Sequence, residues 1–169
     1  LHKANQVIAL VEKKQIKGPI QLKGKMTLCL DGIQDPGNLG TIIRTADWFG
    51  VDQVLCSHET ADAYSPKVVQ ASMGSAFRVK IHYCNLSEVL LKYSNNMPIY
   101  GSLLEGEDIY KTKLVKRGFL IIGNESKGIS IDKSLSASSL LFKTDRFILA
   151  NAFIIFTCSE NCKSPSAIV

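Results

Sequence analysis

Short apolar runs alternate along this chain with stretches of helical periodicity, and this alternation constrains its fold more than any other feature. Apolar runs bounded by polar turn residues are typical of buried strands, whereas apolar residues repeating every three or four positions are typical of one helix face. Strands that alternate with helices usually pair in parallel, so the sequence predicts an α/β fold, a parallel sheet flanked by helices. The predicted strands cover residues 26–30, 53–56, 77–81, 98–101 and 118–122, and the predicted helices cover residues 5–14, 38–50, 65–72 and 85–93.

The length and charge indicate one globular domain preceded by a basic segment. The 169 residues suffice for one domain with a core of its own. No run approaches the roughly 18 to 20 apolar residues of a membrane-spanning helix. The formal net charge is +5, and residues 1–25 hold many lysines against the single acid Glu12. Such a segment suits a linker near phosphate groups, although a solvated lysine-rich helix and loop explains the charge equally well.

The cysteines disfavour both a secreted scaffold and a metal site. Their number is odd, and their spacing is not that of a disulfide framework. Three of them lie in or beside apolar runs, where we expect small buried side chains in a reducing cytoplasm. The two near the C-terminus have no histidine close by, so we expect no zinc and no other metal. The five are Cys29, Cys56, Cys84, Cys158 and Cys162.

Two polar, glycine-containing loops each follow a predicted strand. They cover residues 31–40 and 123–128. In an open parallel sheet, ligands bind beyond the carboxyl ends of the strands, so both loops are candidates for a binding site. In the first loop we expect Asn38 to cap the following helix, while Gly37 and Gly40 allow another backbone or a ligand to approach closely.

Arg44 lies on the polar side of the predicted helix 38–50, on the face that also carries Thr41, Thr45 and Trp48. An exposed arginine beside an aromatic ring suits recognition of phosphate and ribose. The residues alone allow a simpler alternative, in which Arg44 pairs with Asp47 or stacks on Trp48 and has no further role.

The second loop does not carry a known phosphate-binding fingerprint. Residues 123–128 contain neither Gly-x-Gly-x-x-Gly nor Gly-Lys-Ser/Thr. A nucleotide-dependent oxidoreductase therefore has only the α/β pattern in its favour. The alternative interpretation of this loop is an ordinary polar turn between a strand and a helix, with Lys127 solvated.

Residues 30–50, which read LDGIQDPGNLGTIIRTADWFG, resemble the first signature block of SpoU-type (TrmH-like) RNA 2′-O-methyltransferases of the SPOUT class. Residues 120–129, LIIGNESKGI, resemble their second block. Residues 66–75 and 100–110 are also similar to the family. The resemblance extends from about residue 5 to about residue 131, and the first block is highly specific.

This resemblance implies a trefoil-knotted domain, one of the rare exceptions to the rule against knots. It also implies that S-adenosylmethionine binds in the knot and that the substrate is rRNA or tRNA. Members of the family are homodimers in which each active site draws on both subunits. They usually carry an N-terminal RNA-recognition domain, so residues 1–25 would be its end plus a basic linker, and residues 26–169 the methyltransferase domain. A cytoplasmic location is expected.

The resemblance also assigns site residues. The expected catalytic residues are Arg44, Asn38 and Glu125, and the expected cofactor-binding residues are Leu103, Leu104, Gly123 and Asn124. The implied reaction is attack of a ribose 2′-hydroxyl on the methyl group of a sulfonium, with no metal required. Because a guanidinium hardly deprotonates in proteins, our hypothesis is that Arg44 holds a phosphate and stabilises the developing alkoxide, while Asn38 and Glu125 orient the site.

The resemblance is lost after about residue 131. The family's third block, Ile-Pro followed by Ser-Leu-Asn, has no counterpart in the tail, so the knot-forming C-terminus is predicted to be atypical. A shifted reading frame would produce such an abrupt stop, and a different C-terminus is the other explanation. The alternative function is therefore a catalytically impaired RNA-binding or dimerisation module on the same fold.

Overall fold

The computed structural model describes residues 26–103, 117–130 and 139–143, together with a few single positions elsewhere in the chain. Two sequence predictions lie outside these ranges. One is the helix over residues 5–14. The other is the trefoil knot, because the C-terminal segment that would form it falls largely outside the described residues.

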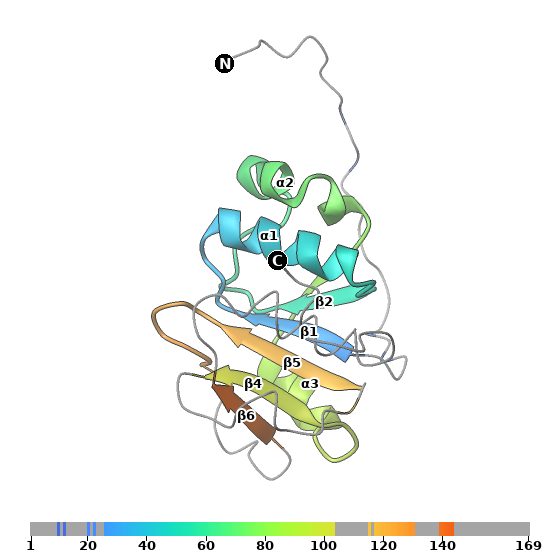
Figure 1. Ribbon diagram of the computed structural model, residues 1–169, viewed down its shortest axis with the longest axis vertical. Helices are drawn as coiled ribbons and strands as arrows, with labels where there is room; N and C mark the ends of the chain where they lie inside the picture. The colour runs from blue at the N-terminus through green and yellow to red at the C-terminus, as the bar shows by residue number, and fades with distance from the viewer. Residues whose placement is uncertain are drawn as a thin grey trace, which may run out of the picture.

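The described residues form one sheet with helices on both sides, which confirms the predicted α/β class (Figure 1). Within this part of the chain the strand order is β3-β2-β1-β5-β4-β6, and each neighbouring pair is parallel. The strands are β1 (Met26–Asp31), β2 (Gln53–Cys56), β3 (Lys80–Tyr83), β4 (Ile99–Leu103), β5 (Gly118–Gly123) and β6 (Ser139–Lys143). The helices are α1 (Pro36–Trp48), α2 (Pro66–Ser72) and α3 (Leu86–Tyr93), with a short 3₁₀ turn, η1 (Ser75–Phe77).

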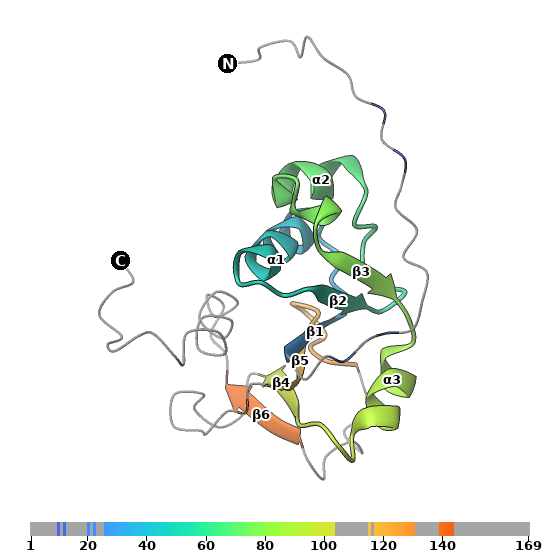
Figure 2. The same ribbon diagram turned by 90° about the vertical axis from the view of Figure 1, so that its right-hand side faces the viewer.

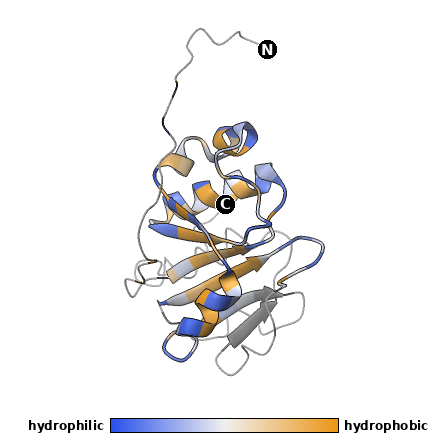
Figure 3. Ribbon diagram, turned by 180° about the vertical axis from the view of Figure 1, so that it is seen from behind, coloured by the Kyte–Doolittle hydropathy of each residue, from blue (hydrophilic) through white to orange (hydrophobic). Residues whose placement is uncertain are grey.

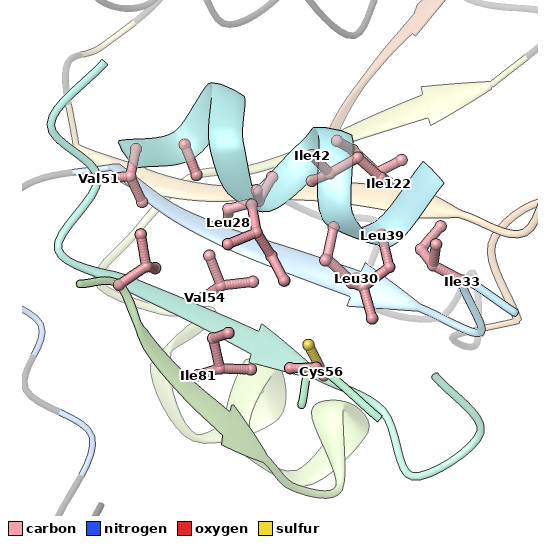
Figure 4. Packing of buried hydrophobic residues seen from close by; sticks show 14 of the residues in the cluster. Leu28, Leu30, Ile33, Leu39, Ile42, Val51, Val54, Cys56, Ile81 and Ile122 are labelled. Atoms are coloured by element: carbon pink, nitrogen blue, oxygen red, sulfur yellow. The ribbon is translucent and has the colours of Figure 1, made fainter. Parts of the chain in front are cut away.

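The central strand β1 is buried on both faces because its side chains alternate between two cores. Leu28 and Leu30 pack toward α1 (Figure 4), whereas Cys29 packs on the other side with Leu86 and Leu90 of α3. Figure 2 shows α1 and α2 on one side of the sheet and α3 on the other. Coloured by hydropathy, the central strands are largely apolar, as strands covered on both faces must be (Figure 3).

The β1–β5 register determines where the two candidate loops lie. These strands pair continuously from Met26 opposite Gly118 to Asp31 opposite Gly123. Both strands therefore end at the same level of the sheet, and the loops that follow them leave side by side at the carboxyl edge.

The predicted start of the helix over residues 85–93 is confirmed. Asn85 is the N-cap of α3, where its side chain accepts the backbone N–H of Glu88 and donates to the Glu88 carboxylate at 2.9 Å. The bond from the Glu88 N–H is the one that a capping box makes, but the Glu88 carboxylate accepts here from the side chain of the N-cap and not from its backbone N–H.

The predicted strand over residues 77–81 is wrong in its first half. Ser75–Phe77 forms the 3₁₀ turn η1, and β3 begins only at Lys80, whose N–H donates to the carbonyl of Asp52. The backbone turns at Ser75 because its carbonyl accepts the N–H groups of both Arg78 and Val79. Strand β6 was not predicted, and it adds to the edge of the sheet beside β4.

The cysteine prediction holds for two of the three residues that the structure describes. Cys29 and Cys56 are fully buried free thiols, and burial raises the pKa of both well above the usual range. Cys84 is only half-buried. Cys158 and Cys162 lie outside the described residues.

Close packing of α1 on α2 depends on Gly40, as the sequence suggested. A Cβ at this position would lie 2.5 Å from the Ala71 Cβ and 2.8 Å from the carbonyl oxygen of Val68. Because a backbone carbonyl in α2 cannot move aside as a flexible side chain can, only glycine fits here.

We therefore expect Gly40→Ala to destabilise the protein, although alanine normally stabilises a helix interior relative to glycine. Overlap with α2 should outweigh that gain and lower the free energy of unfolding by about 1–3 kcal/mol. Urea denaturation measures the change. Thr41→Ala, at the next and exposed position, is the matched control and should change the free energy of unfolding by less than about 0.5 kcal/mol. A stabilised Gly40→Ala protein would contradict this packing.

Candidate active site

Helix α1 begins two residues earlier than predicted, and this changes the role of Asn38. The N-cap is Asp35, whose carboxylate accepts the backbone N–H of Asn38 at 2.8 Å, and Pro36 takes the first helical position. The hydrogen bond from Asn38 holds the pKa of the Asp35 carboxyl below its usual value. The prediction that Asn38 caps the helix is thus wrong. Asn38 lies inside the first turn, and its side chain is available for another partner.

That partner is Glu125. The Asn38 side-chain amide donates to the Glu125 carboxylate, which joins residues 87 positions apart in the sequence. Asn38 is half-buried and Glu125 is exposed. The contact brings two of the three expected catalytic residues together at the carboxyl edge of the sheet, between the loops that follow β1 and β5.

The third expected catalytic residue, Arg44, lies apart from this pair. It is exposed, six residues after Asn38, which places it about 9 Å along the helix axis and about 120° around it. Within the described part of the chain, the Arg44 side chain makes no hydrogen bond or ion pair. The neighbouring hydroxyls of Thr41 and Thr45 donate back to carbonyls of their own helix, those of Gly37 and Thr41.

The alternative in which Arg44 pairs with Asp47 is wrong. The Asp47 carboxylate accepts two hydrogen bonds from Arg78, at 2.8 and 2.5 Å, and one from the Ser75 hydroxyl at 2.8 Å. These bonds fasten the C-terminal turn of α1 to η1. Because Asp47 is already engaged, the Arg44 guanidinium is left to face solvent.

The expected cofactor-binding residues lie at the same edge as far as the structure describes them. Gly123 ends β5, and a side chain there would collide with the backbone of Gly128, so the following loop doubles back closely on the strand. Asn124 opens that loop. Leu103 is the last residue of β4, next to β5 in the sheet, and Leu104 lies outside the described residues.

Sequence reasoning missed the residues that join these loops. Asp31, at the end of β1, accepts the N–H and the hydroxyl of Ser130 at 2.6 and 3.0 Å. Asp31 belongs to the first block, but its buried carboxylate was not singled out. A charged residue at the end of an otherwise apolar strand is the signal that could have identified it, because a buried charge requires partners.

Among the described residues, no group of three or more His, Cys, Asp or Glu side chains is placed to hold a metal ion. None of the described helices has the length and apolar character needed to cross a bilayer.

Comparisons with known proteins agree on the family. The model of the SpoU rRNA Methylase family matches residues 25–141. The 23S rRNA (guanosine(2553)-2′-O)-methyltransferase RlmP of Bacillus subtilis is 37% identical over 124 residues, which are 72% of this chain and 47% of that protein. The chain therefore belongs to the SpoU rRNA methylase family, and it spans about half the length of the curated relatives it matches.

Solved structures show the same fold. An RNA methyltransferase of the TrmH family from Porphyromonas gingivalis superimposes with a TM-score of 0.69 at 36% identity, covering 83% of this chain and 60% of that one. The AdoMet-bound rRNA methyltransferase from Sinorhizobium meliloti gives a TM-score of 0.67 at 32% identity, covering 82% of this chain and 56% of that one.

The Asp47–Arg78 pair predicts a pH-dependent contribution to stability. Its hydrogen bonds lower the pKa of the Asp47 carboxyl below the usual 3.8. A carboxyl whose pKa is depressed by folding stabilises the protein above its unfolded-state pKa and loses this effect as the pH falls through the folded-state pKa. Asp47→Asn should therefore lower the free energy of unfolding at pH 7 by at most about 1 kcal/mol, since Arg78 is largely exposed.

Urea denaturation between pH 7 and pH 3 measures this difference, which should shrink as the pH drops below about 4. Glu59→Gln, which also removes one carboxylate but at an exposed loop position, is the control. A difference between wild type and Asp47→Asn that stays constant down to pH 3 would exclude a charged pair.

Proposed function

We propose that this chain transfers a methyl group from S-adenosylmethionine to a ribose 2′-hydroxyl of rRNA or tRNA. The observation that carries the proposal is the contact between Asn38 and Glu125, because it unites the two signature blocks at the edge where open parallel sheets bind ligands. Family membership and the printed names of the relatives, which are rRNA 2′-O-methyltransferases, support the same function.

The chemistry of the carboxyl edge suits this cofactor. This edge carries the side-chain amides of Asn38 and Asn124, backbone groups, and carboxylates that include the exposed Glu125, and such donors and acceptors recognise a nucleoside and an amino-acid group. Gly128 has a φ of 70° and open space where a side chain would begin. We propose that Gly123 and Leu103, with the following Leu104, hold the cofactor, and that Asn124 shapes the loop beside them. When bound, S-adenosylmethionine supplies a methyl group on a positively charged sulfur.

The residues of the chain must then make a hydroxyl reactive. A ribose 2′-hydroxyl is a poor nucleophile until its proton leaves or its developing charge is stabilised. Arg44 stays protonated and offers a planar set of donors, so its role is to hold the adjacent phosphate and stabilise the 2′-oxygen as it gains charge. Asn38, itself held by Glu125, orients the ribose.

A homodimer with shared active sites explains the position of Arg44. Arg44 is exposed and lies about 120° around α1 from Asn38, so it is better placed to serve the Asn38–Glu125 pair of a second chain. Trp48 lies on the same helix and is 84% exposed, which suits burial against a partner. The free, buried thiols of Cys29 and Cys56 support a cytoplasmic location.

The impaired-module alternative predicts no methyl transfer at all. The family match continues to residue 141, past the point where the sequence resemblance ended, and it includes both residues of the Asn38–Glu125 pair. This favours the enzyme.

We expect Arg44→Ala to lower the rate of methyl transfer by about 100-fold or more, as when a donor to a developing oxyanion is removed. Arg44→Lys should retain part of the rate, because it keeps the positive charge. The assay incubates unmodified rRNA and tRNA transcripts with S-adenosylmethionine and detects 2′-O-methylated nucleosides by mass spectrometry. Arg78→Lys is the matched control, since Arg78 is also exposed but pairs with Asp47. Complete loss in Arg44→Lys, with RNA affinity intact, would argue against an electrostatic role.

Mixing two inactive variants tests whether the site is shared. If Arg44 of one subunit serves Glu125 of the other, refolding Arg44→Ala together with Glu125→Gln restores about a quarter of the wild-type activity, because half of the dimers are mixed and each has one intact site. Absence of any recovery would show that both residues act within one subunit.

A further inference from the structure

The peptide groups of Gly32 tie together three loops at the carboxyl edge. Its N–H donates to the Ser57 hydroxyl oxygen at 2.9 Å, and its carbonyl accepts from the Asn124 side-chain amide at 2.8 Å. Gly32 follows β1, Ser57 follows β2 and Asn124 follows β5. The φ of Gly32 is 68°, in the left-handed region that favours glycine, so this geometry depends on the residue type.

A second tie lies one residue away. Asp31 is only 5% exposed, and its two carboxylate oxygens accept the N–H and the hydroxyl of Ser130. Charge-assisted hydrogen bonds of this kind are short and strong, and they compensate the burial of the carboxylate. The loop after β5 is therefore fastened at its beginning by Asn124 and near its end by Ser130.

Asn124 uses all its polar atoms within the protein. Its backbone N–H and carbonyl pair with those of Gly128 at 2.9 and 2.8 Å, and its side-chain oxygen accepts the N–H groups of Ser126 and Lys127. Its side-chain nitrogen donates to Gly32. The side-chain oxygen is thus committed to two N–H groups and the side-chain nitrogen uses one of its two hydrogens on Gly32, so the side chain is better suited to shaping the loop than to binding a cofactor.

Glu125 lies between Asn124 and Ser130, the two residues that fasten the loop after β5. It immediately follows Asn124, and its carboxylate reaches back across the edge to Asn38, on the helix that begins a few residues after Gly32. The bond from Asn124 to Gly32 thus fixes the backbone that carries the Glu125 side chain relative to the start of α1. Losing it would let the two halves of the pair separate.

We propose that Asn124 and Asp31 are positioning residues, which act by latching the loop after β5 to the end of β1 and so hold Glu125 against Asn38. We call the bonds Asn124–Gly32 and Asp31–Ser130 the loop latch. The inference rests on the proposed function for its effect on catalysis, and it gives Asn124 a role through Glu125 in place of direct contact with the cofactor.

Two substitutions at position 124 dissect the latch. Asn124→Asp removes the donor to Gly32 while it keeps an acceptor for Ser126 and Lys127, and Asn124→Ala removes both. We expect amide hydrogen exchange of residues 126–128 to be about tenfold or more faster in Asn124→Asp, which loses only the bond to Gly32, and faster still in Asn124→Ala. Ser126→Ala, in the same loop, is the matched control, since its hydroxyl makes no bond to the described residues, and it should leave exchange and kcat unchanged. Ser130→Ala, which removes one bond of the other tie, should shift exchange in the same direction.

Kinetics distinguish positioning from cofactor binding. At saturating S-adenosylmethionine, Asn124→Asp should lower kcat by about tenfold or more, because a small displacement of a reacting group is costly. In a Glu125→Gln background the same substitution should have little further effect, since the residue through which it acts is already lost. Calorimetry should give a Kd for S-adenosylmethionine within about threefold of wild type.

A weakened Kd with kcat unchanged in Asn124→Asp would overturn the proposal and make Asn124 a direct ligand of the cofactor. A loss of kcat that adds fully to the loss caused by Glu125→Gln would also overturn it. Unchanged exchange in Asn124→Asp would overturn it as well. The hydrogen-exchange measurement does not depend on enzymatic activity. A wild-type chain that transfers no methyl group would therefore refute the proposed function, and hydrogen exchange alone would then test the loop latch.

Discussion

Strands β1 and β5 pair in parallel along their whole length, from Met26 beside Gly118 to Asp31 beside Gly123, and most of the described structure depends on this pairing. It places two apolar strands at the centre of the sheet, where alternate side chains enter the core under α1 and the core under α3. It also ends both strands at the same level. The two loops that follow must then share one edge, and the chemistry of that edge is built from their side chains.

The arrangement at this edge is made of few bonds, but each joins distant parts of the sequence. Asn38 and Glu125 are 87 positions apart, and Asp31 and Ser130 are 99 apart. Gly32 supplies both a donor and an acceptor because its left-handed backbone turns its N–H and its carbonyl toward different loops. A site that is preorganised in this way needs little rearrangement when a ligand binds, which is an advantage in catalysis.

Local signals in the sequence predicted much of the fold, but few of the hydrogen bonds at the carboxyl edge of the sheet, where the candidate site lies. The central strands were recognisable from apolar runs, and α3 from Asn85 with Glu88, because these features depend on neighbours in sequence. The 3₁₀ turn at Ser75 and the edge strand β6 were missed, since the first depends on contacts with α1 and the second on pairing with β4. The helix start was misplaced because Asp35 and Asn38 are both good N-caps, and Pro36 decided between them. Similarly, Asn38, Arg44 and Glu125 were named through a family resemblance, whereas the bonds of Asp31 and Asn124 could be found only in three dimensions.

If the edge formed by the loops after β1 and β5 belongs to a working methyltransferase, S-adenosylmethionine must bind to this chain. Isothermal titration calorimetry of the chain with S-adenosylmethionine is the measurement. We expect a saturable heat with one site per chain, and Ser126→Ala should leave it unchanged. No heat of binding at about millimolar ligand would contradict it and would favour a non-catalytic module on the same fold.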